Sequence, residues 1–292
     1  MSAAVQGAQI REPALMRAAV LEARAAGRRI GFVPTMGGLH AGHARLVEQA
    51  AAECDDVAVS IFVNPTQFGP AEDFARYPRT LAADVAILEP LGVRWIFVPE
   101  AADMYPPGAA TRVVVDGPAR RFEGEIRPGH FAGVATVVCR LFQCVPADVA
   151  YFGAKDWQQT LVVRRMVHDL GLPIEITVCP TVREADGLAM SSRNAYLAAD
   201  ERQRAVALHE GLCAADRLWQ AGADIAAVEQ ALRQPLEARG IAIDYAAVVS
   251  ADTLDPLPPA GAEPPAVAVV AGRLGSTRLI DNRLLPPRRR PG

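Results

Sequence analysis

Lysine is almost absent from this sequence of 292 residues, because only Lys155 among the 30 Lys and Arg side chains is a lysine. The P-loop sequence GK[ST] is therefore missing, and so is the dinucleotide-binding spacing GxGxxG. An excess of one charge is lacking too, since 33 acidic side chains leave a formal net charge of −3. Without clustered cations, a nucleic-acid coat or a membrane-surface binder is disfavoured.

Paired cysteines and long apolar runs are also missing. The five cysteines form no CxxC pair, and an odd, scattered set is not a disulfide framework, so a reducing compartment fits best. No run of about 18 uncharged apolar residues occurs, and charged residues interrupt the region where a signal peptide would be apolar. We therefore expect a cytoplasmic protein with no membrane span and no nucleic-acid partner.

What the sequence does contain is a regular alternation of strand-like and helical segments. Short apolar runs of strand length occur at residues 29–33, 57–63, 95–98, 149–152 and 174–178. Helical segments alternate with them at residues 13–26, 43–53, 81–91, 131–145 and 156–170. This order predicts an α/β fold with a Rossmann-like parallel sheet and helices on both faces. Ligands of such sheets bind beyond the carboxyl ends of the strands.

The pattern changes after about residue 181. Two consecutive helical segments then precede three short strand-like runs, at residues 199–221, 225–239, 244–249, 267–270 and 277–280. We therefore predict two domains. The first is the Rossmann-like domain at residues 1–181, and the second is a smaller α+β C-terminal domain at residues 182–292.

A glycine-rich turn follows the first strand-like run, with the sequence PTMGGLHAGH at residues 34–43. Glycine lets backbone N–H groups approach a ligand closely, and the N-terminus of the helix that follows favours phosphate. His40 and His43 project to similar sides and are both able to donate to one phosphate chain. Metal binding and a structural role remain as alternatives, although the i, i+4 spacing of helical zinc sites, with its intervening Glu, is absent.

Two further turns carry polar side chains. Asn64 and Gln67 follow the second strand-like run, in SIFVNPTQFGP, and their amides suit a hydroxyl and a carboxylate. Ordinary turn chemistry is the alternative, since Asn-Pro opens many turns. Arg127 and His130 lie in RPGHFAGV, just before a helical segment, where a simple helix-initiating loop is the alternative.

Two later segments have the chemistry of phosphate binding. Lys155 lies in FGAKDWQQ, between a strand-like run and a helix. Ser191, Ser192 and Arg193 lie in VREADGLAMSSRN, where the domain character changes. Hydroxyls and a bidentate guanidinium are strong ligands for phosphate oxygens.

Together these segments resemble the motifs of the pantoate-β-alanine ligase family, within the HIGH-motif adenylate-forming nucleotidyltransferases. PTMGGLHAGH is similar to the HIGH-type motif, and the blocks SIFVNPTQF, YPRT, RPGHFAGV, FGAKDWQQ and VREADGLAMSSRN follow in the family's order. The last block corresponds to the KMSKS loop of related synthetases. We interpret the C-terminal RLGSTRLIDN, which also resembles the family, as structural. Ala154 stands where the family has Glu, which puts a side-chain role there in doubt.

The resemblance implies a ligase reaction in two steps. Pantoate and ATP give pantoyl adenylate and pyrophosphate, and β-alanine then attacks to give pantothenate and AMP. ATP is the co-substrate, Mg²⁺ accompanies the triphosphate, and the protein is a homodimer, as family members are. The catalytic residues that the resemblance implies are His43, His40, Lys155 and Arg193.

The resemblance also implies binding residues. Gln67, Gln159 and Asn64 bind pantoate, Gln67 also contacts β-alanine, and Arg127 and His130 lie near the substrate. The ATP-binding residues are Met36, Gly37, Gly38, Leu39, His40, Ala41, Gly42, His43, Gly153, Ala154, Lys155, Asp156, Val182, Met190, Ser191, Ser192 and Arg193. No metal ligand is identified. Asp84 is a candidate, with an exposed helix acid as the favoured alternative.

Two other functions are compatible with these motifs. One is a nucleotidyltransferase that activates another small molecule through the same HIGH chemistry, and pyrophosphate exchange that does not depend on pantoate would identify it. The other is a non-catalytic nucleotide-binding protein. Such a protein has no reason to combine both imidazoles with Lys155 and Arg193.

Overall fold

The computed structural model describes residues 7–70, 72–258 and 265–287. The chain divides into two compact units. The first comprises residues 1–153 and 158–180, and the second comprises residues 154–157 and 181–292. The short segment 154–157 therefore groups with the second unit, whereas the predicted first domain includes it.

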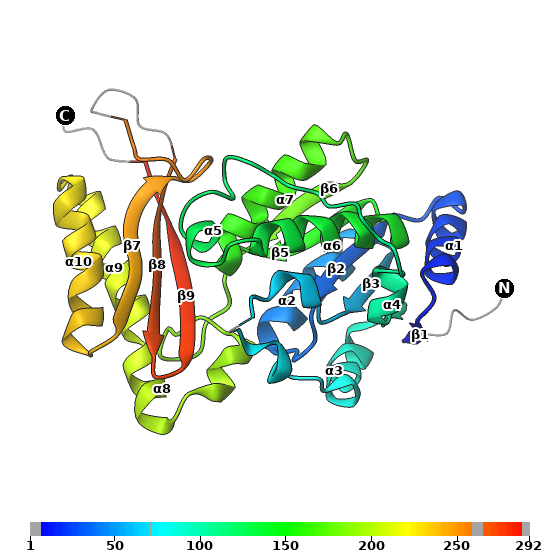
Figure 1. Cartoon of the computed structure of the whole chain (residues 1–292), viewed down its shortest axis with the longest axis horizontal. Coiled ribbons are helices and arrows are strands. Elements are labelled where there is room, and N and C mark those ends of the chain that lie inside the picture. The colour runs from blue at the N-terminus through cyan, green and yellow to red at the C-terminus, as the bar shows by residue number, and fades with distance from the viewer. Residues whose placement is uncertain (1–6, 71, 259–264, 288–292) are drawn as a thin grey trace. The chain divides into compact units, whose positions relative to one another are not determined.

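A six-stranded parallel sheet forms the centre of the first unit (Figure 1). Its strands are β1 (Ala8–Ile10), β2 (Ile30–Thr35), β3 (Asp56–Ile61), β4 (Trp95–Phe97), β5 (Val149–Gly153) and β6 (Glu175–Cys179). Their order in the sheet is β1-β4-β3-β2-β5-β6. The predicted parallel sheet is confirmed, because the central apolar runs form strands that are buried on both faces.

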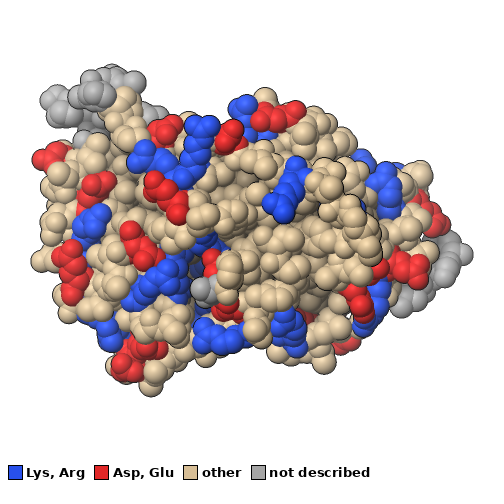
Figure 2. All heavy atoms as spheres, viewed as in Figure 1, with Lys and Arg blue, Asp and Glu red and all other residues tan. Residues whose placement is uncertain are grey.

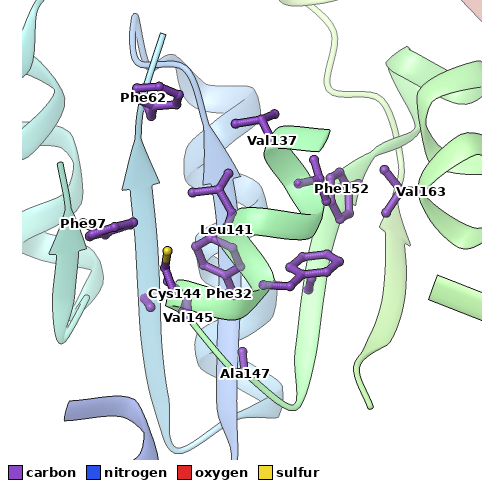
Figure 3. Packing of buried hydrophobic residues seen from close by; sticks show 14 of the residues in the cluster. Phe32, Phe62, Phe97, Val137, Leu141, Cys144, Val145, Ala147, Phe152 and Val163 are labelled. Carbon is purple, nitrogen blue, oxygen red and sulfur yellow. The ribbon is translucent and has the colours of Figure 1, made fainter. Parts of the chain in front are cut away.

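Helices cover both faces of this sheet. They are α1 (Pro13–Ala25), α6 (His130–Cys144) and α7 (Trp157–Asp169) on one face, and α2 (Ala41–Glu53) and α3 (Leu81–Leu88) on the other. Successive strand residues point to opposite faces, so Phe32 of β2 joins the first-face cluster while Val33 joins the second. Figure 3 shows Val137 and Leu141 of α6 facing the strands within the first cluster. The helices predicted in this region are confirmed.

Three short elements of the first unit have no counterpart in the predicted pattern. Strand β1 pairs with β4 at the sheet edge and is only partly buried, so its sequence needs no apolar run. The one-turn helices α4 (Ala101–Met104) and α5 (Glu123–Ile126) lie in the irregular stretch before α6. A single turn is too short to show helical periodicity.

The second unit packs three helices against a small antiparallel sheet. The sheet has the order β7-β8-β9, and its strands are β7 (Ala242–Ser250), β8 (Ala266–Leu274) and β9 (Thr277–Leu285). The helices are α8 (Ala199–Ala205), α9 (Ala207–Gln220) and α10 (Ile225–Ala238). The predicted α+β character is confirmed. The helix predicted at residues 199–221 is in fact two helices, interrupted at Val206, where ψ is −21°.

The surface mixes charges of both signs. On the face drawn in Figure 2, basic and acidic side chains are interspersed rather than separated by sign. Many of them are paired, as Arg202 is with Glu184 and Asp186. In the ranges that the structure describes, no helix is both long enough and apolar enough to cross a bilayer.

Candidate active site

The glycine-rich turn leads from β2 into α2 at the carboxyl end of the sheet. Gly37 and Gly38 both have positive φ, +81° and +61°, which glycine adopts without strain. The N–H of Gly37 donates to Thr35 Oγ1, and those of Gly38 and Leu39 donate to the carboxylate of Asp84. These three N–H groups are thus engaged within the chain, so the glycines provide the shape of the turn rather than donors for a ligand.

Asp84 of α3 is the anchor of this turn. Its Oδ1 accepts from Leu39 N at 2.8 Å and from Thr80 Oγ1 at 3.2 Å, and its Oδ2 accepts from Gly38 N at 3.1 Å. The residue is 1% exposed, so the expectation of an exposed helix acid is wrong. The carboxylate is buried because three donors compensate its desolvation. No sequence pattern indicates this role, and only the position of Asp84 after YPRT draws attention to the residue.

His40 and His43 cap the start of α2 reciprocally. Nδ1 of His40 accepts from Gly42 N at 3.1 Å, and Nδ1 of His43 accepts from His40 N at 3.3 Å. The two ring centroids lie 4.2 Å apart. Because Nδ1 accepts in each ring, the neutral imidazole carries its proton on Nε2. Both histidines therefore carry their Nε2–H at the N-terminus of α2, a position whose helix dipole favours phosphate.

A polar turn after β3 holds Asn64 and Gln67 together. Nδ2 of Asn64 donates to Gln67 Oε1 at 3.0 Å and to Gly133 O at 3.2 Å, while its Oδ1 accepts from the hydroxyl of Tyr105 at 2.7 Å. Nε2 of Gln67 lies 2.9 Å from Sδ of Met36 in the glycine-rich turn. Asn64 thus fixes the amide of Gln67 with its nitrogen facing Met36. Tyr105 is a second residue of the site that no sequence motif indicates.

Arg127 and His130 lie on the far side of the same turn. Arg127 pairs with Glu72 through two bonds of 2.6 and 2.7 Å, and its Nη1 lies 3.1 Å from His130 Nε2. Nδ1 of His130 donates to the carbonyl oxygen of Gln67 at 2.8 Å. Burial, reinforced by the charge of Arg127, lowers the pKa of His130 to about 4, so the ring is neutral at pH 7. His130 thus holds the backbone of Gln67, and Arg127 lies against His130.

The turn after β5 contains a short 3₁₀ segment, Ala154–Asp156, before α7 begins. Nζ of Lys155 lies 3.8 Å from Asp156 Oδ1, and its side chain is 19% exposed. The carbonyl oxygens of Ala154 and Lys155 accept hydrogen bonds from Asn282 of β9. The backbone at position 154 is therefore held although the family's Glu is replaced by Ala.

Gln158 and Gln159, adjacent on α7, differ in what they bind. Gln158 accepts from Glu123 N and donates to Pro118 O and Arg121 O, so its amide is fully engaged. Within the part of the chain that the structure describes, the half-buried Gln159 has no such partner. Gln159 is thus the member of the pair whose amide remains for a ligand.

The segment from Val182 to Arg193 folds as a small hairpin followed by a 3₁₀ turn. The N–H of Met190 donates to the carbonyl oxygen of Val182, and the backbones of Arg183 and Ala189 form an antiparallel β-bridge. Asn194 closes the hairpin by donating to Glu184 Oε1 and Ala189 O. Ser191 Oγ accepts from Arg193 N at 3.3 Å and caps the turn Ser192–Tyr196. The side chains of Ser191, Ser192 and Arg193 are all partly exposed.

The predicted site residues form one set in each unit. The first unit brings together Met36, His40, His43, Asn64 and Gln67, and it also carries Arg127, His130 and Gln159. The second unit carries Lys155, Ser191, Ser192 and Arg193. The first set combines imidazoles and neutral amides, and the second combines cations and hydroxyls.

Comparison with known proteins assigns this arrangement to a family. A family model described as "Pantoate-beta-alanine ligase" matches residues 8–284. A pantothenate synthetase of Acidobacterium capsulatum is 52% identical over 88% of this chain and 86% of its own length. One of Thermus thermophilus is 53% identical over 90% of this chain and 96% of its own length.

Solved structures give the same result. The crystal structure of pantothenate synthetase from Thermus thermophilus superposes with a TM-score of 0.90 at 48% identity, covering 96% of this chain and 100% of that one. The pantoate-beta-alanine ligase of Francisella tularensis, complexed with beta-gamma ATP and beta-alanine, has a TM-score of 0.79 at 33% identity. That alignment covers 95% of this chain and 97% of the other.

Proposed function

This chain belongs to the pantoate-beta-alanine ligase family, and we propose that it joins (R)-pantoate to β-alanine in an ATP-dependent reaction. It is a ligase of pantothenate biosynthesis, which forms a C–N amide bond and releases AMP and pyrophosphate by way of a pantoyl adenylate. One observation carries this function. The family match runs from residue 8 to residue 284, so it includes every motif of both units.

The first half-reaction is a problem of charge and position. The carboxylate of pantoate must approach an α-phosphate that is already surrounded by negative oxygens, so cationic and N–H donors must stabilise the transition state while attack stays in line. In our proposal, His40 and His43 direct their Nε2–H groups at the phosphate chain, and His43 is the principal catalytic imidazole. Their reciprocal caps support this, because these caps fix both tautomers.

Pantoate presents a carboxylate and two hydroxyls beside a gem-dimethyl group. We assign Gln67 and Gln159 to its polar groups, and Gln67 also to β-alanine, since the nucleophile must reach the same acyl carbon. The amide of Asn64 is committed to Gln67, Gly133 and Tyr105, so we propose that Asn64 supports pantoate binding through Gln67. The contacts of Asn64 support this assignment, because they orient the amide of Gln67 before any ligand arrives. Apolar walls for the dimethyl group are available in the same unit at Phe62 and Val134.

The second unit supplies the remaining donors. We assign Lys155 and Arg193 to phosphate oxygens, together with the hydroxyls of Ser191 and Ser192. Around them, the backbone segments proposed to contact ATP are Gly153 to Asp156, Val182 and Met190. No covalent enzyme intermediate is needed, so no activated thiol or hydroxyl nucleophile is required.

Mg²⁺ is proposed to arrive bound to the triphosphate. Among the described residues, no group of three or more His, Cys, Asp or Glu side chains is arranged to hold a metal ion. The buried carboxylate of Asp84 is occupied by backbone donors and does not fit the role of a ligand. Mg²⁺ commonly keeps several waters and binds substrate phosphates, so it needs no protein cage.

AMP release tests the function directly. We expect AMP to form only when ATP, pantoate and β-alanine are all present. Exchange of pyrophosphate into ATP should require pantoate but not β-alanine. An AMP rate that is unchanged when pantoate or β-alanine is omitted would contradict the ligase. Exchange that is independent of pantoate would identify the alternative, a nucleotidyltransferase for another acid.

His43→Ala tests the catalytic imidazole. Adenylate formation should fall by at least about a hundredfold, since electrostatic donors in such sites contribute on that scale. His168→Ala is the matched control, because His168 is an α7 histidine with an 80% exposed side chain. Equal activity of the two variants would remove His43 from the mechanism, provided circular dichroism shows that both are folded.

We also propose a cytoplasmic homodimer. Sedimentation velocity should show a species of twice the 31.1 kDa chain mass, and a single species at the chain mass would contradict the dimer.

A further inference from the structure

The turn that carries Lys155 is held by one side chain from the end of the chain. Nδ2 of Asn282, on β9, donates to the carbonyl oxygen of Ala154 at 2.9 Å and to that of Lys155 at 2.7 Å. Asn282 is only 7% exposed, so these bonds form away from competing water. Both protons of one amide nitrogen thus fix two successive peptide groups, and the second of these belongs to the only lysine of the sequence.

The preceding residue of β9 fixes the segment that leads to Arg193. Asp281 binds the guanidinium of Arg183 in a bidentate pair, at 2.7 and 3.1 Å. Arg183 in turn donates to the carbonyl oxygen of Gly187 at 3.0 Å, within the hairpin that precedes Ser191. Asp281 is 3% exposed. Two adjacent residues of β9 therefore secure the two segments that lead to Lys155 and Arg193, the cations proposed to bind ATP.

The choice of an amide at position 282 has a chemical reason. Two carbonyl oxygens need two donors, which a single –NH₂ group provides. A carboxylate of the same size would repel both carbonyls and would add a negative charge beside the backbone of Lys155. A cationic side chain would satisfy the carbonyls but would add a competing charge. A neutral amide holds the backbone and leaves the field around Lys155 unchanged.

Lysine needs such support more than most side chains. Its ammonium is a point charge on a flexible four-carbon stem, so the position of Cα decides which oxygens the charge can reach. Misplacement of a catalytic group by about 1 Å reduces rates by about a hundredfold. We propose that Asn282 is a positioning residue for Lys155, which places the ammonium for the phosphates of ATP. This inference rests on the proposed function, in which Lys155 binds ATP.

A purely structural role for Asn282 makes a different prediction, and a double-mutant cycle separates the two. The dissociation constant of a non-hydrolysable ATP analogue is measured by titration calorimetry for the wild type, Asn282→Ala, Lys155→Ala and the double variant. If Asn282 acts through the ammonium, Asn282→Ala should weaken binding by about tenfold in the wild type but by less than about twofold in the Lys155→Ala background. An equal loss in both backgrounds, or no loss in either, would overturn the proposal.

Two controls complete the design. Arg283→Gln alters the next residue of β9, whose guanidinium pairs with Asp216 and lies 3.8 Å from Cys213 Sγ, both on α9, so ATP affinity should not change. Asn282→Asp keeps the size of the side chain but removes both donors, and it should weaken binding at least as much as Asn282→Ala. Wild-type affinity in Asn282→Asp would contradict the positioning role.

Pyrophosphate exchange by the wild type tests the ligase function, and the double-mutant cycle tests the role of Asn282. If the wild type shows pyrophosphate exchange that depends on pantoate while the cycle shows no coupling, only the role of Asn282 is lost. If the wild type itself shows no such exchange, the ligase function is contradicted whatever the variants do.

Discussion

The glycine-rich turn of the first unit and the lysine turn of the second are both proposed to contact ATP, yet they are anchored with opposite polarity. In the first, two backbone N–H groups, of Gly38 and Leu39, point at a buried acceptor, the carboxylate of Asp84. In the second, two backbone carbonyls, of Ala154 and Lys155, point at a buried donor, the amide of Asn282. Each anchor complements the backbone groups that its turn presents.

This difference shows what each turn leaves for a ligand. With the N–H groups of Gly38 and Leu39 committed to Asp84, the first turn leaves the proposed phosphate contacts to the imidazoles of His40 and His43 at the start of α2. With the carbonyls of Ala154 and Lys155 committed to Asn282, the second turn directs neither of these two acceptors toward a phosphate and keeps the ammonium of Lys155 as its active group. Asp84 and Asn282 both lie far along the chain from the turns that they hold. Each side chain therefore fixes a backbone conformation that local sequence preferences do not determine.

Removing the first anchor should have the largest effect. Asp84→Ala leaves the buried N–H of Leu39 and the part-buried N–H of Gly38 without an acceptor, and we expect the free energy of unfolding to fall by about 4 kcal/mol and ligase turnover to fall with it. Urea unfolding and AMP release measure the two effects. The unfolding free energy of Asp84→Asn should lie between those of Asp84→Ala and the wild type, because the amide has one acceptor oxygen where the carboxylate has two.

Asp103→Asn is the matched control for this anchor. Asp103 also accepts from a backbone N–H, that of Glu100, but it does so at the exposed start of α4. Its substitution should lower the unfolding free energy by less than about 1 kcal/mol, as for a helix cap. If Asp84→Ala lowered the unfolding free energy by no more than Asp103→Asn does, the glycine-rich turn would not depend on its buried carboxylate.

A third anchor, His130, sharpens the comparison because it is a donor that titrates. Its Nδ1–H holds the carbonyl of Gln67, and burial lowers its pKa to about 4 from the usual 6.5. Between these two pH values the unfolded chain binds the proton and the folded chain does not. Stability is therefore fully present above pH 6.5 and should fall by about 3 kcal/mol as the pH drops to about 4.

His130→Asn isolates this contribution. Asparagine can donate to the same carbonyl but does not titrate, so its unfolding free energy should fall less steeply between pH 6.5 and 4 than that of the wild type. Urea unfolding at several pH values compares the two slopes. Parallel slopes would mean that His130 is not the group responsible.

The sequence predicted the strands and helices better than it predicted the side chains that anchor the turns. The central strands of the parallel sheet are apolar on both faces, so short apolar runs such as residues 57–63 located them. The edge strand β1 and the one-turn helices carried no such pattern. Similarly, the break at Val206 lies within an uninterrupted helical pattern and depends on local backbone geometry.

The anchors were missed because their partners are far away in the chain. Asp84 follows the helical pattern of α3, and only the contact with Gly38 and Leu39 explains why a charged residue is buried there. Asn282 was interpreted as structural within RLGSTRLIDN, since no spacing rule connects it to position 155. Motif resemblance identified the groups proposed to touch substrate, whereas the groups that hold them required three-dimensional contacts.

Lys155→Arg should have the smallest effect and bears most directly on the second turn. The charge and the backbone contacts with Asn282 persist, so the unfolding free energy should not change. A planar guanidinium is larger and directs its donors in a fixed fork, so it cannot occupy the position of a compact ammonium. We expect kcat/KM for ATP to fall by about tenfold, equivalent to about 1.4 kcal/mol.

Steady-state kinetics with Arg164→Lys, an exchange on the exposed side of α7, provide the control. Native kinetics in Lys155→Arg would show that the single lysine of this sequence is interchangeable with arginine, and that the turn held by Asn282 positions charge without selecting its shape.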